Sequence, residues 1–157
     1  MPRHSETKTT PYRADQLFDL VADVGRYPEF LPWCVGARVR SHGETELVAD
    51  LTSGFGPFRE SFTSRVKLGR PAAMDVNYEN GPFKYLHNQW RFTPDGDGCK
   101  VAFSVDFEFR SRLLALAIGP VFGEAVRRMV NAFMQRARII YGPATLRGAA
   151  SAQQVGV

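Results

Sequence analysis

Cysteine and histidine are scarce in this sequence. Cys34 and Cys99 are too few for a disulfide framework, and neither has cysteine or histidine neighbours at the spacing of a zinc site. His4, His42 and His87 are scattered, so no pair of metal ligands and no base beside a nucleophile is indicated. We therefore expect reduced thiols, no metal, no catalytic cofactor and no enzymatic activity.

Long hydrophobic runs are also missing. No segment reaches the roughly 18 consecutive apolar residues of a membrane-spanning helix, and the polar residues 1–10 do not resemble a signal peptide. The 157 residues suit one domain, which we place at residues 1–143. Residues 144–157 are small, polar and aperiodic, which is typical of a disordered tail. A cytoplasmic protein is expected.

Aromatic residues, in contrast, are plentiful. The chain has twelve Phe, five Tyr and two Trp. Their wide, flat apolar surfaces suit either a dense core or the wall of a cavity. Composition leaves both possibilities open.

Positive charge is concentrated in one segment. Residues 110–141 contain six arginines and one acidic residue, Glu124, whereas residues 1–109 carry a net charge of −2. Such a basic segment can meet an anionic membrane or RNA. The alternative is a solvated helix face that aids solubility.

Two short helices are predicted near the N-terminus. Apolar residues from Ala14 to Val21 recur at the spacing of one helix face. Arg13 before them is a poor N-cap. Asp23 can cap a second short helix, which Pro32 limits because the residue before a proline avoids helical geometry.

The middle of the chain predicts antiparallel strands. The clearest is residues 100–110, where apolar and polar side chains alternate. Turn residues such as Asn80-Gly81 and residues 95–98 favour hairpins. We expect six or seven strands, the others being near residues 5–10, 37–41, 46–53, 58–68, 73–78 and 86–93.

After Ser111 the period becomes helical. Apolar residues from Phe122 to Ile140 follow a helix pattern for five turns. Pro120 suits the first turn of this helix, and Gly142-Pro143 suit its end. The predicted fold class is therefore α+β, with the apolar face of the sheet packed on the long helix.

Several motifs resemble a known family. They are YPEFLPWC at residues 27–34, GFGPFRE at 54–60, FTSRV at 62–66, GPF at 81–83, WRF at 90–92, FEF at 107–109 and Tyr141-Gly142. In order and spacing they are similar to the coenzyme Q-binding, polyketide cyclase-like family of the START-like superfamily. Bacterial members of that family are also described as ribosome-association toxins.

The resemblance implies a helix-grip fold, in which the sheet wraps around the long C-terminal helix. It also implies a tunnel that binds the isoprenoid tail of ubiquinone, and a lipid chaperone that supports respiratory electron transport. The alternative it carries is a toxin-like protein that blocks ribosomal subunit association. Aromatase or cyclase chemistry follows from the wider superfamily alone and lacks a convincing acid and base here.

Candidate ligand contacts lie on faces expected to be interior, or at the mouth of such a tunnel. They are Phe30, Leu31, Trp33, Leu51, Phe55, Phe58, Glu60, Phe62, Phe83, Trp90, Phe103, Val105, Phe107, Phe122, Met129 and Phe133. Alternation places Glu60 beside Phe58 and Phe62, and a buried carboxylate demands a partner. That partner is either an arginine or a polar head group. Phe30 and Trp33 either gate the cavity or plug the core.

The uncharged stretch LLALAIGPVF at residues 113–122 is a candidate surface contact. It is too short to span a bilayer but long enough to lie on one; the alternative is a plain core helix. Arg110, Arg112, Arg127 and Arg128 flank it and are candidate contacts to membrane or RNA. The expected partners are ubiquinone or a similar prenyl lipid and the anionic surface of the inner membrane, with the ribosome as the alternative and no DNA.

Overall fold

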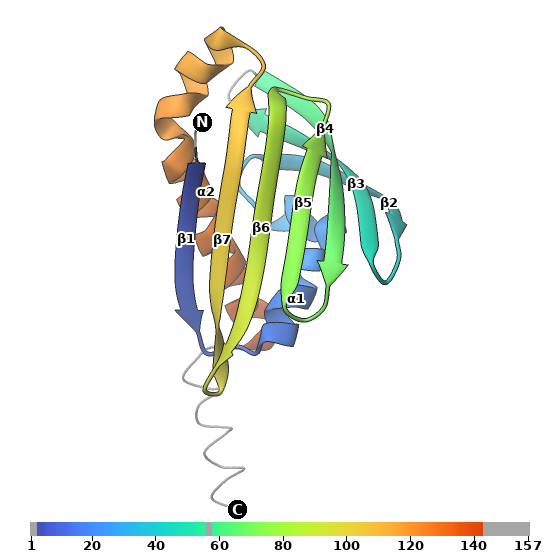
Figure 1. The fold of residues 1–157 in the computed structure, drawn as a ribbon, viewed down its shortest axis with the longest axis vertical. Coiled ribbons are helices and arrows are strands. Elements are labelled where there is room, and N and C mark those ends of the chain that lie inside the picture. Colours follow the sequence, from blue (N-terminus) through green and yellow to red (C-terminus); the bar gives the residue numbers. More distant parts are fainter. Residues whose placement is uncertain (1–2, 56–57, 143–157) are drawn as a thin grey trace, which may run out of the picture.

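One antiparallel sheet forms the body of the protein (Figure 1). The structure is a computed structural model that describes residues 3–55 and 58–142, so the predicted tail lies outside the described residues. The described strands number seven and confirm the predicted α+β class. They are β1 (Arg3–Thr10), β2 (Cys34–His42), β3 (Glu46–Phe55), β4 (Phe58–Gly69), β5 (Ala73–Glu79), β6 (Phe83–Asp95) and β7 (Gly98–Phe109).

The strand order is β1-β7-β6-β5-β4-β3-β2, with every neighbouring pair antiparallel. Consecutive strands from β2 to β7 therefore form hairpins. The first strand, β1, lies at the edge opposite β2 and pairs with the last strand, β7. Asn80 and Gly81 have φ of 61° and 90° in the turn from β5 to β6. Gly98 lies so close to β1 that an added Cβ would stand 1.9 Å from the Thr10 carbonyl oxygen, which requires glycine there.

Two short helices follow β1, as predicted. They are α1 (Ala14–Ala22) and the 3₁₀ helix η1 (Val24–Glu29). The Arg13 side chain makes no capping hydrogen bond, in keeping with its poor cap propensity. The Gln16 carboxamide compensates, because its oxygen accepts from the Arg13 amide at 2.9 Å.

The long helix α2 runs from Arg112 to Tyr141, so the predicted start at Pro120 is wrong. Ser111 caps it, with Oγ accepting from the amides of Leu113 and Leu114 at 3.1 and 3.4 Å. An interior proline removes one helical hydrogen bond, a cost of roughly 3 kcal/mol. The helix nevertheless continues through Pro120, because the turn before it packs half-buried apolar side chains against the core. Its predicted end is confirmed, since Gly142 follows with φ of 90°.

The core lies between the sheet and the three helices, which share one side of it (Figure 1). Every second residue of β7 from Val101 to Phe109 is buried against them, as alternation predicts. From α2 the core receives Val126, Val130, Phe133 and Ala137. The Tyr141 hydroxyl donates to the Gln16 carbonyl at 2.8 Å and ties the end of α2 to α1. Within the described ranges, no helix has the length and apolar character to cross a membrane.

Candidate functional site

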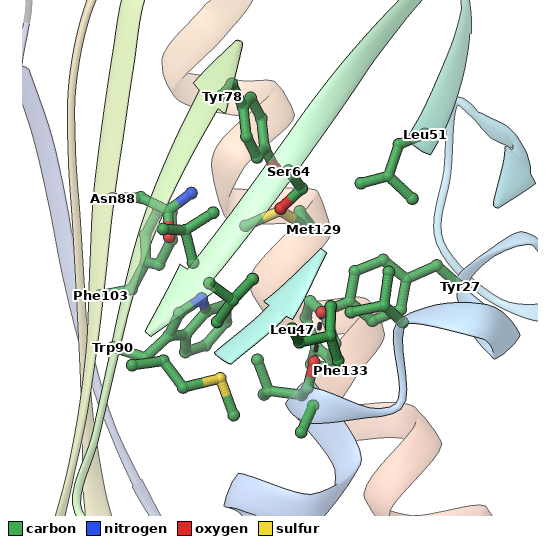
Figure 2. A pocket seen from close by; sticks show the side chains of 16 residues that line it. Tyr27, Leu47, Leu51, Ser64, Tyr78, Asn88, Trp90, Phe103, Met129 and Phe133 are labelled. Atoms are coloured by element: carbon green, nitrogen blue, oxygen red, sulfur yellow. Dashed lines mark hydrogen bonds between the residues drawn. The ribbon is translucent and has the colours of Figure 1, made fainter. Parts of the chain in front are cut away.

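A small cavity of about 40 Å³ lies between the sheet, α1, η1 and α2 (Figure 2). Most of its wall is apolar. Its lining consists of Val21, Ala22, Val24, Tyr27, Leu47, Leu51, Ser64, Val66, Met74, Val76, Tyr78, Asn88, Trp90, Phe103, Met129 and Phe133.

Three neighbouring strands bring polar side chains to this cavity: Ser64 from β4, Tyr78 from β5 and Asn88 from β6 (Figure 2). Asn88 is only 6% exposed, and its Oδ1 is without a hydrogen-bond partner in the described part of the chain. Burial raises the pKa of Tyr78 to about 12, so this hydroxyl stays neutral. An unpaired buried acceptor is costly, so the site calls for a donor such as a water or a ligand hydroxyl.

Another wall of the cavity is part of a packed aromatic cluster around Phe133, which is 1% exposed. Its ring centroid lies 5.4 Å from Tyr27, 5.3 Å from Phe30 and 5.2 Å from Trp90, each with near-perpendicular planes. Edge-to-face contacts of this kind stabilise the arrangement beyond burial alone. This wall therefore moves only if several rings move together.

The size of the cavity limits what it holds in this conformation. An apolar cavity of roughly 150 Å³ admits benzene, whereas a water needs about 10–15 Å³. The 40 Å³ here accommodates water but not an aromatic ring. A quinone with a prenyl tail requires the walls to open.

The structure brings some of the predicted ligand contacts to the cavity and leaves others away from it. Five of them line it: Leu51, Trp90, Phe103, Met129 and Phe133. Phe30 and Leu31 instead border an open groove beside α2. Trp33 is half-buried at positive φ (65°) between η1 and β2 and does not line the cavity.

The remaining predicted contacts pack elsewhere in the core. Phe83, Phe107 and Phe122 join Phe109 in a separate cluster, where the Phe107 and Phe122 centroids are 3.9 Å apart. These rings consolidate the sheet against the first half of α2. Val105 is a buried core residue, and Phe62 stacks on Tyr78 at 4.4 Å. The side chains of Phe55 and Phe58 lie outside the described part.

Glu60 is half-buried on β4, in register with Ser53. No hydrogen bond or ion pair joins it to any described side chain. Of the two alternatives for Glu60, a structural hydrogen bond or ion pair with an arginine is therefore not found among the described residues. The head-group role stays a prediction.

Sequence reasoning missed Asn88, Tyr78 and Tyr27. Asn88 could have been found, because it alternates with Leu86 and Trp90 on the interior face of β6. An isolated amide in such a row is a signal of a buried polar contact. Tyr27 carries no such signal; its hydroxyl donates to the Val21 carbonyl only because η1 folds back on α1.

A second concavity is an open groove of about 560 Å³ between residues 28–32 and α2. Arg128, Asn131 and Gln135 line its α2 side, and Phe30 and Leu31 lie opposite them. This groove presents a cation and two carboxamides beside apolar surface.

The candidate arginines fall into two groups. Arg127 and Arg128 both contact Glu124, at 2.6 and 3.3 Å, and Arg127 also lies 3.6 Å from Glu6. Arg110 and Arg112 are exposed, and neither side chain has a hydrogen-bond or ion-pair partner within residues 3–55 and 58–142. Over the same residues, no three His, Cys, Asp or Glu side chains gather in a way that could hold a metal ion.

Comparison with known proteins agrees with this architecture. Residues 10–134 match the family described as polyketide cyclase / dehydrase and lipid transport. The chain is 44% identical to the ribosome association toxin RatA of Pseudomonas aeruginosa, covering 84% of this chain and 92% of that protein. It is 35% identical to the mitochondrial coenzyme Q-binding protein COQ10 homolog B of Xenopus laevis, covering 88% of this chain and 59% of that protein.

Among solved structures, the Zhui aromatase/cyclase from Streptomyces superposes with a TM-score of 0.78 at 17% identity, over 88% of this chain and 95% of that one. That likeness concerns the fold alone, and it fits the helix-grip arrangement of a sheet around a long C-terminal helix. Fold, motifs and relatives agree: this chain belongs to the polyketide cyclase / dehydrase and lipid transport family.

Proposed function

We propose that this chain associates with ribosomal particles through the basic outer face of α2, and that it acts by binding without a catalytic step. The relative from Pseudomonas aeruginosa, whose name describes ribosome association, supports this proposal over nearly the whole domain. Interference with subunit joining is the effect that such binding would have.

The observation that carries the proposal is the composition of the outer face of α2 beyond Pro120. This face carries three exposed arginines, Arg127, Arg128 and Arg138. It also carries one acidic residue, Glu124. Phosphate contacts by arginine are the main source of affinity for RNA. The adjoining groove adds the amide groups of Asn131 and Gln135, which can hydrogen-bond bases or ribose.

Co-sedimentation with ribosomal subunits tests this proposal. Binding should weaken steeply as salt rises from about 50 to 200 mM. The double variant Arg127→Glu with Arg128→Glu should bind far more weakly and lower the salt slope by about 2, since each lost phosphate contact contributes about one unit.

The matched control is Lys67→Glu with Lys100→Glu, which changes the net charge equally on two exposed residues of β4 and β7. This control should still co-sediment. Absence of wild-type co-sedimentation at low salt, or equal loss in both double variants, would refute ribosome binding through α2.

A second candidate is binding of ubiquinone or a similar prenyl lipid. The apolar lining of the cavity and the coenzyme Q-binding relative favour it. Because 40 Å³ is smaller than one ring, loading requires α2 or η1 to move away from the sheet. Organic extraction of protein purified from its native host should release a quinone, and repeated absence of any prenyl lipid by mass spectrometry would count against this candidate.

A further inference from the structure

The outer face of α2 changes character along its length. From Leu113 to Val121 its exposed side chains are all apolar, at spacings of three and one that keep them together on the helix surface. Leu113, Leu116 and Val121 are 75%, 71% and 45% exposed, and Ala117 and Pro120 between them are exposed as well. Beyond Val121 most exposed residues of the same face are polar or charged, and Ile139 near the end of the helix is an exposed apolar exception. We call Leu113, Leu116, Ala117, Pro120 and Val121 the apolar tip.

Packing within the domain does not account for the apolar tip. The inner side of the same turns is already packed on the core through the half-buried Leu114, Ile118 and Phe122. A helix lying on a sheet normally presents polar residues outward. Large exposed apolar patches on a folded protein mark contact sites. The apolar tip therefore calls for a partner outside the domain.

Arg110 and Arg112 place positive charge beside the apolar tip. Arg110 and Arg112 are exposed, without a side-chain partner in the described part of the chain. The sequence has no acidic residue between Glu108 and Glu124, and Glu108 itself lies 3.9 Å from Lys84. The electrostatic complement of this end of α2 is an anionic surface.

We propose that the apolar tip, together with Arg110 and Arg112, docks on the surface of an anionic lipid bilayer. Figure 1 shows the first turns of α2, in orange, beyond the upper end of β1. Residues 112–121 extend about 15 Å, half the thickness of the hydrocarbon core, so they lie in the interface and do not cross it. The leucines enter the acyl boundary while the guanidinium groups reach lipid phosphates.

A lipid surface fits this end of α2 better than RNA does. RNA phosphates would satisfy the two arginines but would leave Leu113 and Leu116 against a polar backbone. An anionic bilayer satisfies both kinds of group. This docking goes beyond ribosome association. It uses the N-terminal half of α2, whereas Arg127, Arg128 and Arg138 lie in the C-terminal half.

Vesicle flotation with the full chain tests the proposal. Wild-type protein should float with vesicles of phosphatidylcholine mixed with phosphatidylglycerol, and much less with phosphatidylcholine alone. The variant Leu113→Gln with Leu116→Gln should lose about tenfold or more in binding to the mixed vesicles. The variant Arg110→Gln with Arg112→Gln should lose about thirtyfold on mixed vesicles and almost nothing on neutral ones.

The matched control is Ile139→Gln. Ile139 is also 75% exposed and lies on α2, but it is outside the apolar tip, so its replacement should leave flotation unchanged. Circular dichroism and the urea midpoint verify that each variant is folded. An environment-sensitive fluorophore on Leu116→Cys, in a Cys34→Ala background, should shift its emission to the blue on mixed vesicles.

Four outcomes would overturn the proposal. Wild-type protein does not float, or the double leucine variant floats as well as the wild type. Alternatively, the leucine variant loses ribosome co-sedimentation and keeps flotation, which would make the apolar tip a ribosome contact. Finally, a wild-type dimer that the leucine variant converts to a monomer would show that a second copy of the chain covers the tip.

Discussion

Arg136 of α2 binds Glu29 at the end of η1, with Nη2 2.9 Å from Oε1, across 107 positions of sequence. The same guanidinium lies over the Phe30 ring, 5.1 Å from its centroid. Because Phe30 in turn packs on Phe133, this contact holds η1 against α2 beside the cavity. Opening the cavity from this side requires the pair to separate.

The two partners of this pair should contribute unequally to stability. The Arg136 side chain is 16% exposed and that of Glu29 is 50% exposed. Glu29→Gln should therefore cost less than about 1 kcal/mol in the free energy of unfolding, because water screens its charge. Arg136→Ala should cost about 1–2 kcal/mol, since it also removes the stem and the contact with Phe30. Urea denaturation measures both; equal losses would mean that the ion pair, and not packing, dominates.

The N-cap of α2 gives a second prediction. Ser111→Ala should lower the free energy of unfolding by about 1 kcal/mol, because the amides of Leu113 and Leu114 lose their acceptor. Ser111→Asp should retain most of the stability, since a carboxylate caps equally well and favours the helix N-terminus. If the alanine and aspartate variants unfold at the same urea concentration, Ser111 does not set the start of α2.

The Asn88 Oδ1, which has no partner among the described residues, predicts that an apolar replacement is tolerated in the cavity. Asn88→Leu has similar volume and removes the buried Oδ1, but it also removes the side-chain hydrogen bond to Tyr78, so the free energy of unfolding should change by less than about 1 kcal/mol. Asn88→Ala, which enlarges the cavity, should be less stable than Asn88→Leu. Thermal and urea unfolding compare the three proteins. A marked loss with leucine would show that the hydrogen bonds of Asn88, to Tyr78 and to a bound water, outweigh the cost of burying the amide.

The buried thiol of Cys99 predicts a loss of stability at alkaline pH. Burial raises its pKa from 9.0 to about 11. The folded state thus holds this proton more tightly than the unfolded chain, so its contribution is complete below pH 9 and is lost as pH rises through 11. Between pH 8 and pH 10 the free energy of unfolding should fall by about 1 kcal/mol from this group.

The Cys99→Ala variant should show a smaller decline over the same pH range, measured by urea titrations at each pH. In native wild-type protein, a thiol reagent at pH 8 should modify the half-buried Cys34 well before Cys99, which is 0% exposed. Rapid modification of Cys99 without unfolding would contradict its burial.

Much of the fold was predictable, because its signals are local. Alternation along β7 predicted the buried row from Val101 to Phe109, and the turn residues at Asn80-Gly81 separated β5 from β6. The start of α2 was not predictable from Pro120. Propensity alone favours a start at the proline, whereas the tertiary packing of Leu114 and Ile118 extends the helix to Ser111.

The candidate site was predicted only in part, for the same reason. Interior faces follow from a period of two, so Leu51, Trp90 and Phe103 were placed correctly toward the cavity. Alternation cannot say which interior residues border a void, because a void is the space left after residues from distant strands and helices have packed. Phe83, Phe107 and Phe122 share the apolar pattern of the cavity wall and yet fill a separate cluster.

By itself, the sequence determined the elements, their inner faces and the position of the basic segment, since each depends on residues a few positions apart. The tertiary structure decided the volume of the cavity, the burial of Asn88 and the pairing of Arg136 with Glu29. It also decided that Leu113 and Leu116 remain exposed beside Arg110 and Arg112. These properties depend on which surfaces meet in space, and contacts between residues far apart in the chain are set only when the whole sheet closes around α2.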